Sequence, residues 1–378
     1  MSNQRMQESV FTRHSNPCVE RVRPYIPGPT SSMISARYGI PPNQIVKISS
    51  NEAPLGPSPK VRAALKAIAD SDELHRYPSS TVPGLRKAIA ATIGVSPDQI
   101  LAGAGSTDTW PLIVRAFSLP GDQVLVVEPS MTSYAEVAIL SERKARVVLM
   151  EFPFVVSAAE VLRAVAPETR VIFLSSPNNT TSRLIDINTI RQIAMGAPDA
   201  VVVVDEHYIE AADSYREVTA VNLIPTAPNL IVTRSLSKMY GLAGVRVGYA
   251  VGPETAIGIL MKFKPKWNIS VLAEVAALAA VEDQDHLAQN IAVTRDGRSF
   301  LEKSLRALHE VEVVPEAQGG FLLFRTLSRP AHDVVEDLFR RGIMVRGDLL
   351  DGYIRVSVGT PEQNEAFITA LESAIKGK

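Results

Sequence analysis

The sequence has only one cysteine, Cys18, among its 378 residues. One thiol cannot form a disulfide within the chain or a cysteine-rich metal site, so these two sources of stability are excluded. A lone cysteine is more often a small buried or surface residue than a nucleophile. The cysteine content therefore fits a reducing compartment, and no metal site is expected.

Long apolar runs and an excess of one charge are also missing. No apolar stretch approaches the roughly 18 residues of a membrane span. The polar start, MSNQRMQESVFTRHSNPCVER, lacks the apolar core of a signal peptide, so we expect a cytoplasmic protein without membrane contact. The net charge is −1, and no basic face indicates nucleic acid. Small molecules or other subunits are the expected partners.

Short aliphatic runs alternate with helical segments from about residue 58. They are QVLVVEP (123–129), ARVVLM (145–150), RVIFLSSP (170–177), AVVVVDE (200–206) and NLIVTRS (229–235). Runs without polar alternation indicate strands buried on both faces and joined by right-handed crossovers. The pattern predicts an α/β fold in which a mainly parallel, doubly wound sheet forms a large domain over residues 50–275.

The chain changes character after about residue 275. A long helical stretch from about 272 precedes strand-like runs in 311–325, 342–347 and 353–359, with helices near 332–341 and from 361. This order predicts a smaller α+β domain over residues 276–378. Residues 1–49 are rich in proline and are expected to form an N-terminal arm and part of the small domain.

Polar residues follow several of the predicted strands. In open parallel sheets, ligands bind beyond the carboxyl ends of the strands, so these are the positions at which a site is expected. The segments are GAGSTD (103–108), PNN (177–179), DEHY (205–208) and SLSK (235–238), with Arg246 eight positions after the lysine.

Taken singly, these residues have ordinary structural interpretations. Lys238 could be a solvated strand end, Asp205 could cap the next helix, and Arg355 could lie at the solvent edge of a strand. The GAGSTD segment could be a nucleotide-binding turn, but no ribose-binding acid follows at the expected spacing.

Together and in order, the motifs resemble the aspartate aminotransferase superfamily of pyridoxal-phosphate enzymes, most closely its histidinol-phosphate aminotransferase branch. They run over nearly the whole chain: VRPYIPG, SSNEAPLGPSP, RYP, DEHYIE, SLSKMYGLAGVRVGY and YIRVSVGTPEQN. The resemblance implies an aspartate aminotransferase-like fold and pyridoxal 5′-phosphate as cofactor. It also implies an amino donor and a 2-oxo acid as substrates, and a homodimer with shared active sites.

The same resemblance implies roles for particular residues. Lys238 would bind the cofactor as a Schiff base and then move a proton during catalysis. Asp205 would pair with the pyridine nitrogen, and Tyr208 and Asn179 with the phenolic oxygen. The cofactor phosphate is assigned to Gly105, Ser106, Thr107, Ser235, Ser237, Arg246 and, from the neighbouring subunit, Tyr77.

Substrate contacts are implied as well. Arg355 would grip the substrate carboxylate or phosphate through its planar fork. Asn179 would contribute to the same pocket, and Tyr25 of the N-terminal arm would close over the substrate.

The chain departs from the family pattern at several positions. NTTS (179–182) stands where the family usually has Asn-Pro-Thr-Gly, so the turn must be built differently. Met131 takes the place of the aromatic residue that normally stacks on the pyridine ring. His207 and Gly320 also replace residues that are more common in the branch.

We therefore expect an aminotransferase that acts on an amino acid or an amino-alcohol phosphate. A decarboxylase, racemase or oxidase on the same scaffold is the main alternative, because the cofactor supplies the shared chemistry. A regulatory protein with this fold would carry a DNA-binding segment. The first fifty residues are neither basic nor helix-turn-helix in pattern.

Overall fold

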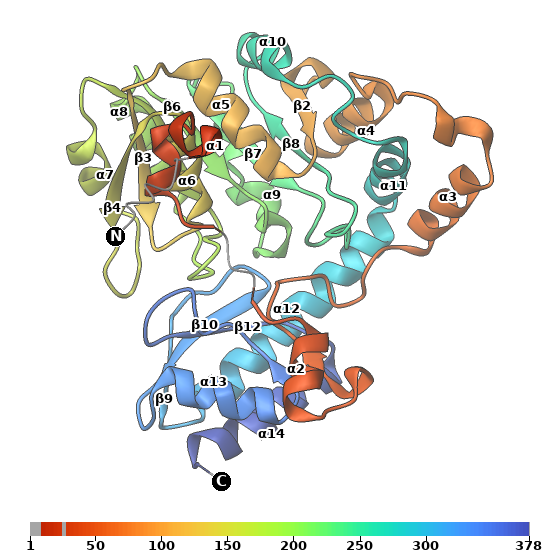
Figure 1. The fold of residues 1–378 in the computed structure, drawn as a ribbon, viewed down its shortest axis with the longest axis vertical. Coiled ribbons are helices and arrows are strands. Elements are labelled where there is room, and N and C mark those ends of the chain that lie inside the picture. Colours follow the sequence, from red (N-terminus) through yellow and green to blue (C-terminus); the bar gives the residue numbers. More distant parts are fainter. Residues whose placement is uncertain (1–8, 25–27, 378) are drawn as a thin grey trace, which may run out of the picture.

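The computed structural model describes residues 9–24 and 28–377. Figure 1 shows a larger part built around one sheet and a smaller part below it, and helix α12 (Gln284–Arg306) runs between them. Among the described residues, no helix is long and apolar enough to cross a membrane. The described residues also contain no group of three or more His, Cys, Asp or Glu side chains that could hold a metal ion.

The larger part contains a seven-stranded sheet in the order β2-β8-β7-β6-β5-β3-β4. Only β8 runs against its neighbours, β2 and β7; the other adjacent pairs are parallel, as the sequence predicts. The strands are β2 (Ile100–Gly103), β3 (Gln123–Glu128), β4 (Lys144–Leu149), β5 (Thr169–Ser175), β6 (Val201–Asp205), β7 (Leu230–Ser235) and β8 (Gly248–Val251).

One strand differs from expectation. The sequence predicts that every aliphatic run is buried on both faces, but β4 is largely exposed, and Leu149 keeps 71% of its surface accessible. The reason is position, because β4 lies at the edge of the sheet and pairs only with β3. An edge strand has one open side, which aliphatic composition alone does not disclose.

Helices cover both faces of this sheet, and alternate strand residues point to opposite faces. Val202 and Val204 belong to one hydrophobic cluster with residues of α3, α4, α7, α8 and α11. Val203 belongs to another with α5, α6 and α10. The helices are α3 (Pro59–Ala69), α4 (Pro83–Ile93), α5 (Thr109–Phe117), α6 (Ser133–Leu140), α7 (Ala158–Ala164), α8 (Ile187–Gly196), α9 (Tyr215–Val218), α10 (Glu254–Phe263) and α11 (Val271–Val281).

The smaller part holds an antiparallel sheet in the order β12-β10-β9 and a separate parallel pair, β1 with β11. Its core, which includes Phe324 and Phe367, packs these strands against helices. The elements are β1 (Val46–Lys47), β9 (Val311–Val313), β10 (Phe321–Thr326), β11 (Ile343–Met344), β12 (Ile354–Ser357), α13 (Ala331–Arg340) and α14 (Pro361–Ile375).

The long helical stretch expected from about residue 272 is two helices, because α11 ends at Val281 and α12 begins at Gln284. Helix α11 packs on α3 and α4, whereas α12 packs on α14 and β9. The expected boundary at residue 275 falls inside α11, and the division into domains stays a prediction.

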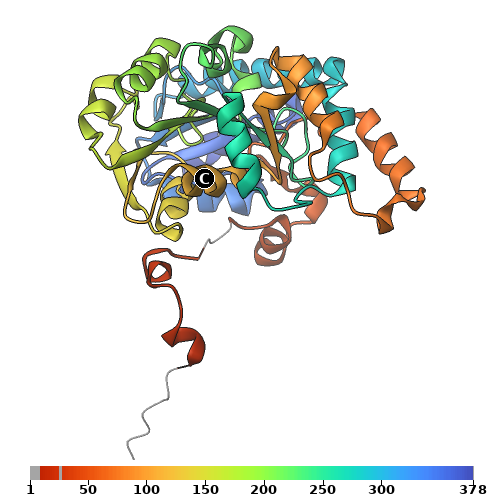
Figure 2. The same cartoon turned by 90° about the horizontal axis from the view of Figure 1, so that it is seen from above.

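The N-terminal region contains α1 (Val10–Arg13) and α2 (Ser31–Tyr38). Figure 2 shows α1 projecting from the body of the chain, whereas the following short helix η1 (Pro17–Arg21) contacts α6 and α2 packs on α13. Tyr25, which the sequence suggests as a substrate contact, lies outside the described residues.

Candidate active site

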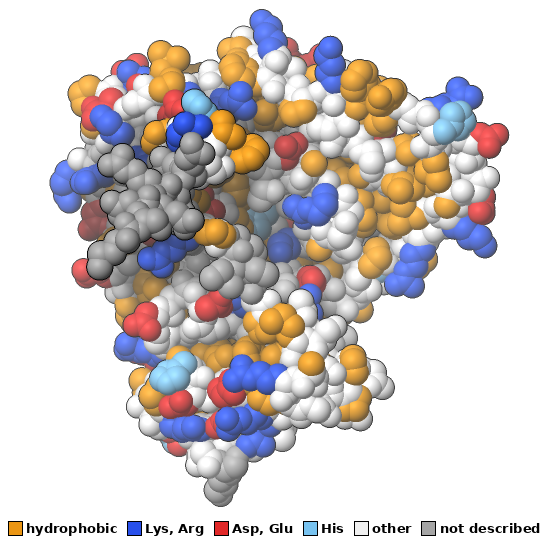
Figure 3. Space-filling view, viewed as in Figure 1, with side chains coloured by type: hydrophobic (Ala, Val, Ile, Leu, Met, Phe, Trp, Pro, Cys, Tyr) orange, Lys and Arg blue, Asp and Glu red, His pale blue; other side chains and the backbone are white. Residues whose placement is uncertain are grey.

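A cavity of about 550 Å³ lies between the two parts of the chain. Figure 3 shows Lys and Arg side chains at this hollow. Residues far apart in the sequence meet there because strand ends converge on it: Asn179 follows β5, Tyr208 follows β6, Lys238 follows β7, and Arg355 lies on β12. The remaining wall includes Ser50, Ser130, Met131, Thr132, Ser133, Arg346, Asp348 and Leu349.

The amine of Lys238 faces this cavity. Its Nζ atom donates a hydrogen bond to the carbonyl oxygen of Ser50 at 3.1 Å and lies 5.3 Å from the ring centroid of Tyr208. The residue is half-buried. A primary amine held at a strand end in this way is placed to react with a carbonyl group in the cavity.

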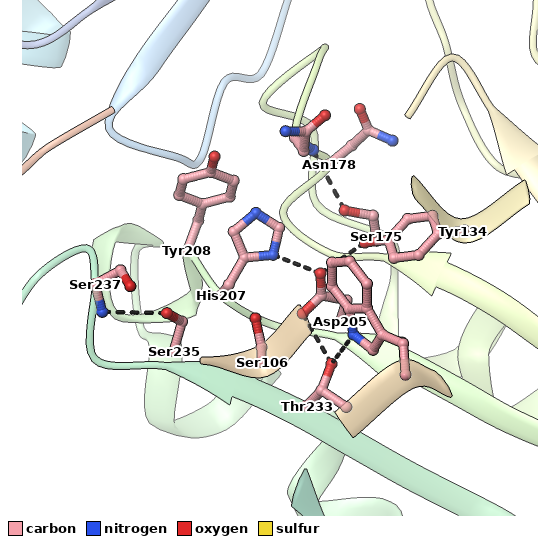
Figure 4. Close-up of polar contacts among 12 residues, drawn as sticks. Ser106, Tyr134, Ser175, Asn178, Asp205, His207, Tyr208, Thr233, Ser235 and Ser237 are labelled. Carbon is pink, nitrogen blue, oxygen red and sulfur yellow. Dashed lines mark hydrogen bonds and ion pairs between the residues drawn. The ribbon is translucent and has the colours of Figure 1, made fainter. Parts of the chain in front are cut away.

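Asp205 is fully buried at the end of β6 and accepts three hydrogen bonds (Figure 4). Tyr134 and His207 each lie 2.6 Å from its Oδ2 atom, and Thr233 donates to Oδ1 at 2.8 Å. A carboxylate has about four acceptor positions, so one is left for a further N–H group. The sequence did not indicate Tyr134 or Thr233 as functional, although Tyr134 lies three residues after Met131.

His207 joins this cluster through one ring nitrogen. Burial alone would lower the pKa of the imidazole, but the charge and hydrogen bond of Asp205, together with Tyr208, outweigh burial and raise the pKa. The other ring nitrogen, Nε2, is buried and has no hydrogen-bond partner among the described residues. A buried polar atom without a partner fits a site that is completed by a polar ligand.

A second group of donors lies around the turn before α5. Ser106 begins the short helix η5 (Ser106–Asp108), Arg246 donates to the Ser237 hydroxyl at 3.2 Å, and the Ser237 amide donates to Ser235 at 3.1 Å. Hydroxyls, a guanidinium and amides at a helix start are the donors that a phosphate dianion needs. Thr107, also expected here, is exposed.

Two glycines permit this close approach. Gly105 has φ +90°, and a Cβ atom on it would lie 2.6 Å from the Nη2 atom of Arg246. A Cβ atom on Gly248 would lie 2.3 Å from the backbone nitrogen of Ser106. The Gly248 contact is with rigid backbone, and the left-handed φ of Gly105 is one that glycine adopts most easily, so both positions favour glycine in this donor group.

Tyr208 has an unusual electrostatic environment. Burial would raise the pKa of its hydroxyl, but Lys238, His207 and Arg355 outweigh burial, together with a hydrogen bond from Asn51, and the pKa falls to about 7. A phenol with such a pKa changes charge near neutral pH and is a strong hydrogen-bonding group in either form.

Two arginines, Arg355 and Arg346, also line the cavity. Arg355 is buried and donates to the carbonyl oxygens of Asn179 at 2.8 Å and Ser49 at 3.1 Å. Arg346, which the sequence did not indicate, donates twice to Asp348, at 2.6 and 2.8 Å. Burial would raise the pKa of Asp348, but Arg346 outweighs burial and lowers it. The feature that could have indicated Arg346 from the sequence is its position in the strand-like run 342–347, shortly before YIRVSVG.

The unusual turn after β5 is closed by side chains. The Oδ1 atom of Asn178 accepts hydrogen bonds from the amides of Thr180 and Thr181, both at 2.9 Å. Ser182 takes the left-handed conformation, with φ +66°, and its hydroxyl accepts a hydrogen bond from the amide of Gly319 at 2.9 Å. The chain thus forms this turn without the proline and glycine that the family usually has.

Tyr77 is not brought to the cavity of its own chain. It is 81% exposed, and its ring stacks on Trp267 with the centroids 4.8 Å apart. Met131, by contrast, lies in the cavity wall, as expected from its position in the sequence.

The amine of Lys238 lies in the cavity wall, and the buried carboxylate of Asp205 and the phosphate-type donor group lie at the ends of strands of the same sheet. This fold and this set of residues define a pyridoxal-phosphate-dependent aminotransferase. Residues 43–371 match the model of the family described as aminotransferase class I and II. The chain therefore belongs to this family.

Individual relatives agree with this assignment. The chain is 33% identical to the histidinol-phosphate aminotransferase of Methanocaldococcus jannaschii, over 94% of this chain and 96% of the relative. It is 36% identical to the enzyme of the same name from Methanococcoides burtonii, over 92% and 95%. The structure of histidinol-phosphate aminotransferase from Sinorhizobium meliloti in complex with pyridoxal-5′-phosphate matches with a TM-score of 0.85 and 23% identity. That match covers 98% of this chain and 99% of the other, and it shows the fold.

Proposed function

We propose that this aminotransferase moves the amino group of an amino-alcohol phosphate of the histidinol-phosphate type to a 2-oxo acid. The observation that carries the proposal is the presence of Lys238 and Arg355 in one cavity, with a second arginine, Arg346, in its wall. The names of the relatives support the same substrate.

Lys238, Asp205 and the phosphate-type donor group hold the cofactor in this proposal. Pyridoxal phosphate, when bound, supplies the electron sink that makes a substrate Cα–H bond acidic. Lys238 would hold the cofactor covalently, and once the substrate's amino group displaces it, the freed Lys238 amine would move the proton at the substrate Cα. Asp205 accepts the N–H group of the ring in its remaining acceptor position, and Ser106, Ser235, Ser237 and Arg246 hold the phosphate.

Arg355 binds the acidic end of the substrate. Its guanidinium presents a planar fork that matches a carboxylate or phosphate. Arg346 adds a second positive charge to the cavity wall, and Asp348, which accepts two hydrogen bonds from it, balances this charge. The carboxylate of the 2-oxo acid uses the same arginine in the second half of the reaction, because both substrates must place their reacting carbon at Lys238.

We further infer that the enzyme is a cytoplasmic homodimer in which Tyr77 completes the phosphate site of the other subunit. The exposed Tyr77 and Trp267 stack supports this, because an exposed aromatic pair is a frequent feature of subunit interfaces.

The proposal is tested by mixing the purified holoenzyme with single amino donors and no oxo acid. Histidinol phosphate should convert the cofactor stoichiometrically to pyridoxamine phosphate, which chromatography measures. If a donor without phosphate reacts faster, the proposed substrate is wrong. If carbon dioxide is released, configuration is inverted or oxygen is consumed while the aldehyde form persists, the proposed reaction is wrong.

A further inference from the structure

Asn51, in the SSNEAPLGPSP segment, has no role in the function proposed above. Its side chain is buried, with 3% of its surface exposed, and its backbone takes the left-handed conformation with φ +54°. Asparagine tolerates this conformation better than most residues. The side chain lies between Ser357 on β12 and the hydroxyl of Tyr208.

The hydrogen bonds of Ser357 agree with the direction in which the Asn51 amide points. The backbone N–H of Asn51 donates to the Ser357 hydroxyl oxygen at 2.8 Å. The one hydroxyl proton of Ser357 is therefore free to donate to Oδ1 of Asn51, which lies at 2.6 Å. In this orientation Oδ1 accepts from Ser357 and the NH₂ group faces Tyr208, whose oxygen lies 3.0 Å from Nδ2.

This arrangement determines the role of the phenol. Because an amide NH₂ group can only donate, the Tyr208 oxygen accepts from Asn51. The proton of Tyr208, when present, is left to donate in another direction. We propose that Asn51 is a positioning residue that keeps Tyr208 as an acceptor on this side and so makes it a donor toward the cofactor's phenolic oxygen.

The inference rests on the proposed contact between Tyr208 and the cofactor. It also links Tyr208 to the strand that carries Arg355. Arg355 and Ser357 are two residues apart on β12 and lie on the same face of that strand. The strand that carries the proposed substrate arginine therefore also holds, through Asn51, the phenol beside Lys238. The other charged groups that act on Tyr208 are Lys238, His207 and Arg355.

The first test titrates Tyr208 in the apoenzyme by the near-ultraviolet absorption of phenolate, and Tyr208→Phe identifies the signal. Asn51→Gly removes the donor at a left-handed position that glycine accepts, and the pKa should rise by about one pH unit. Asn51→Asp replaces the donor by a carboxylate and should raise the pKa further. Asn222→Ala, at an exposed asparagine, should leave the titration unchanged. An unchanged titration in both Asn51 variants would overturn the proposal.

The second test measures the dissociation constant of pyridoxal phosphate in a double-mutant cycle. Asn51→Gly should weaken binding about tenfold in the wild-type background and have no effect in Tyr208→Phe. Equal weakening in both backgrounds would mean that Asn51 acts through the fold and not through Tyr208.

The tests remain decisive if the Asn51 variants fail to fold, and they do not depend on the identity of the substrate. If the Asn51 variants do not fold, Ser357→Ala takes their place, since the loss of the orienting hydroxyl should also raise the pKa of Tyr208, and an unchanged pKa would contradict the proposal. The apoenzyme titration needs no donor and no turnover. It can therefore succeed when the proposed substrate is wrong, and it can fail when that substrate is right.

Discussion

The Nδ1 atom of His207 lies 2.6 Å from the Oδ2 atom of Asp205, and both side chains are buried at the end of β6. Two residues of one short segment thus form a pair whose charge state depends on pH. Because Asp205 also accepts from Tyr134 and Thr233, the carboxylate is held in place before any ligand binds.

The pair formed by His207 and Asp205 should contribute most to the free energy of unfolding of the apoenzyme at low pH. The folded pKa of His207 is raised, so its contribution is fully present below the unfolded pKa of about 6.5 and is lost as pH rises through the folded pKa. His207→Ala should reduce the free energy of unfolding by about 2 kcal/mol below that pH, and by less at alkaline pH. Chemical unfolding measured across pH checks this. His332→Ala, at an exposed histidine beside Asp333, is the matched control, and a His207 effect that is equal at every pH would contradict the account.

Gly248→Ala should damage the phosphate-type donor group. The new Cβ atom would meet the backbone nitrogen of Ser106 at 2.3 Å, so the turn must move. We expect the affinity of the apoenzyme for pyridoxal phosphate to fall about tenfold or more in an equilibrium titration. Gly244→Ala, four residues earlier, adds a Cβ atom with nothing within 4 Å and should bind normally. Equal affinities for the two variants would remove the phosphate role from this turn.

Arg355→Lys should raise KM for both the amino donor and the 2-oxo acid by about tenfold, because lysine cannot form the planar fork. Arg325→Lys is the control, since Arg325 lies on the neighbouring strand β10 but pairs with Glu312 outside the cavity. Steady-state kinetics with each substrate varied in turn provides the measurement. A rise in KM for one substrate alone would show that the two acids do not share Arg355.

Tyr77→Phe tests the shared site without disturbing the aromatic stack on Trp267. Loss of the hydroxyl should weaken cofactor binding by up to about tenfold if Tyr77 reaches the partner's phosphate. Sedimentation should show a dimer for both proteins. A monomer that binds pyridoxal phosphate tightly and turns over at full rate would contradict the dimeric site.

Much of this arrangement could be predicted because it depends on local pattern. The aliphatic runs at β3, β5, β6 and β7 and the polar residues after them indicated both the sheet and the position of Lys238 and Asp205. The exposure of β4 and the antiparallel strand β8 could not be predicted, because edge position and strand direction depend on pairing partners that are distant in the sequence.

The supporting residues of the site were missed for a similar physical reason. Tyr134, Thr233 and Asn51 look like ordinary core or turn residues, and they become functional candidates only through contacts across the fold. Asn51 and Tyr208, for example, are 157 residues apart and yet share a hydrogen bond. Ser182 could not be predicted from its local sequence either, because its backbone takes a left-handed conformation that a serine at this position does not suggest.

The central claim, that Lys238 is the residue to which the cofactor is attached, is tested most directly by borohydride reduction of the holoenzyme followed by peptide mapping. The reduced pyridoxyl group should be found on Lys238 in the peptide that contains SLSKMYG. Lys238→Ala should lack both the label and turnover, whereas Lys264→Ala, at a lysine that contacts Asn268, should be labelled normally. A label on any other lysine of the wild-type protein would contradict the account.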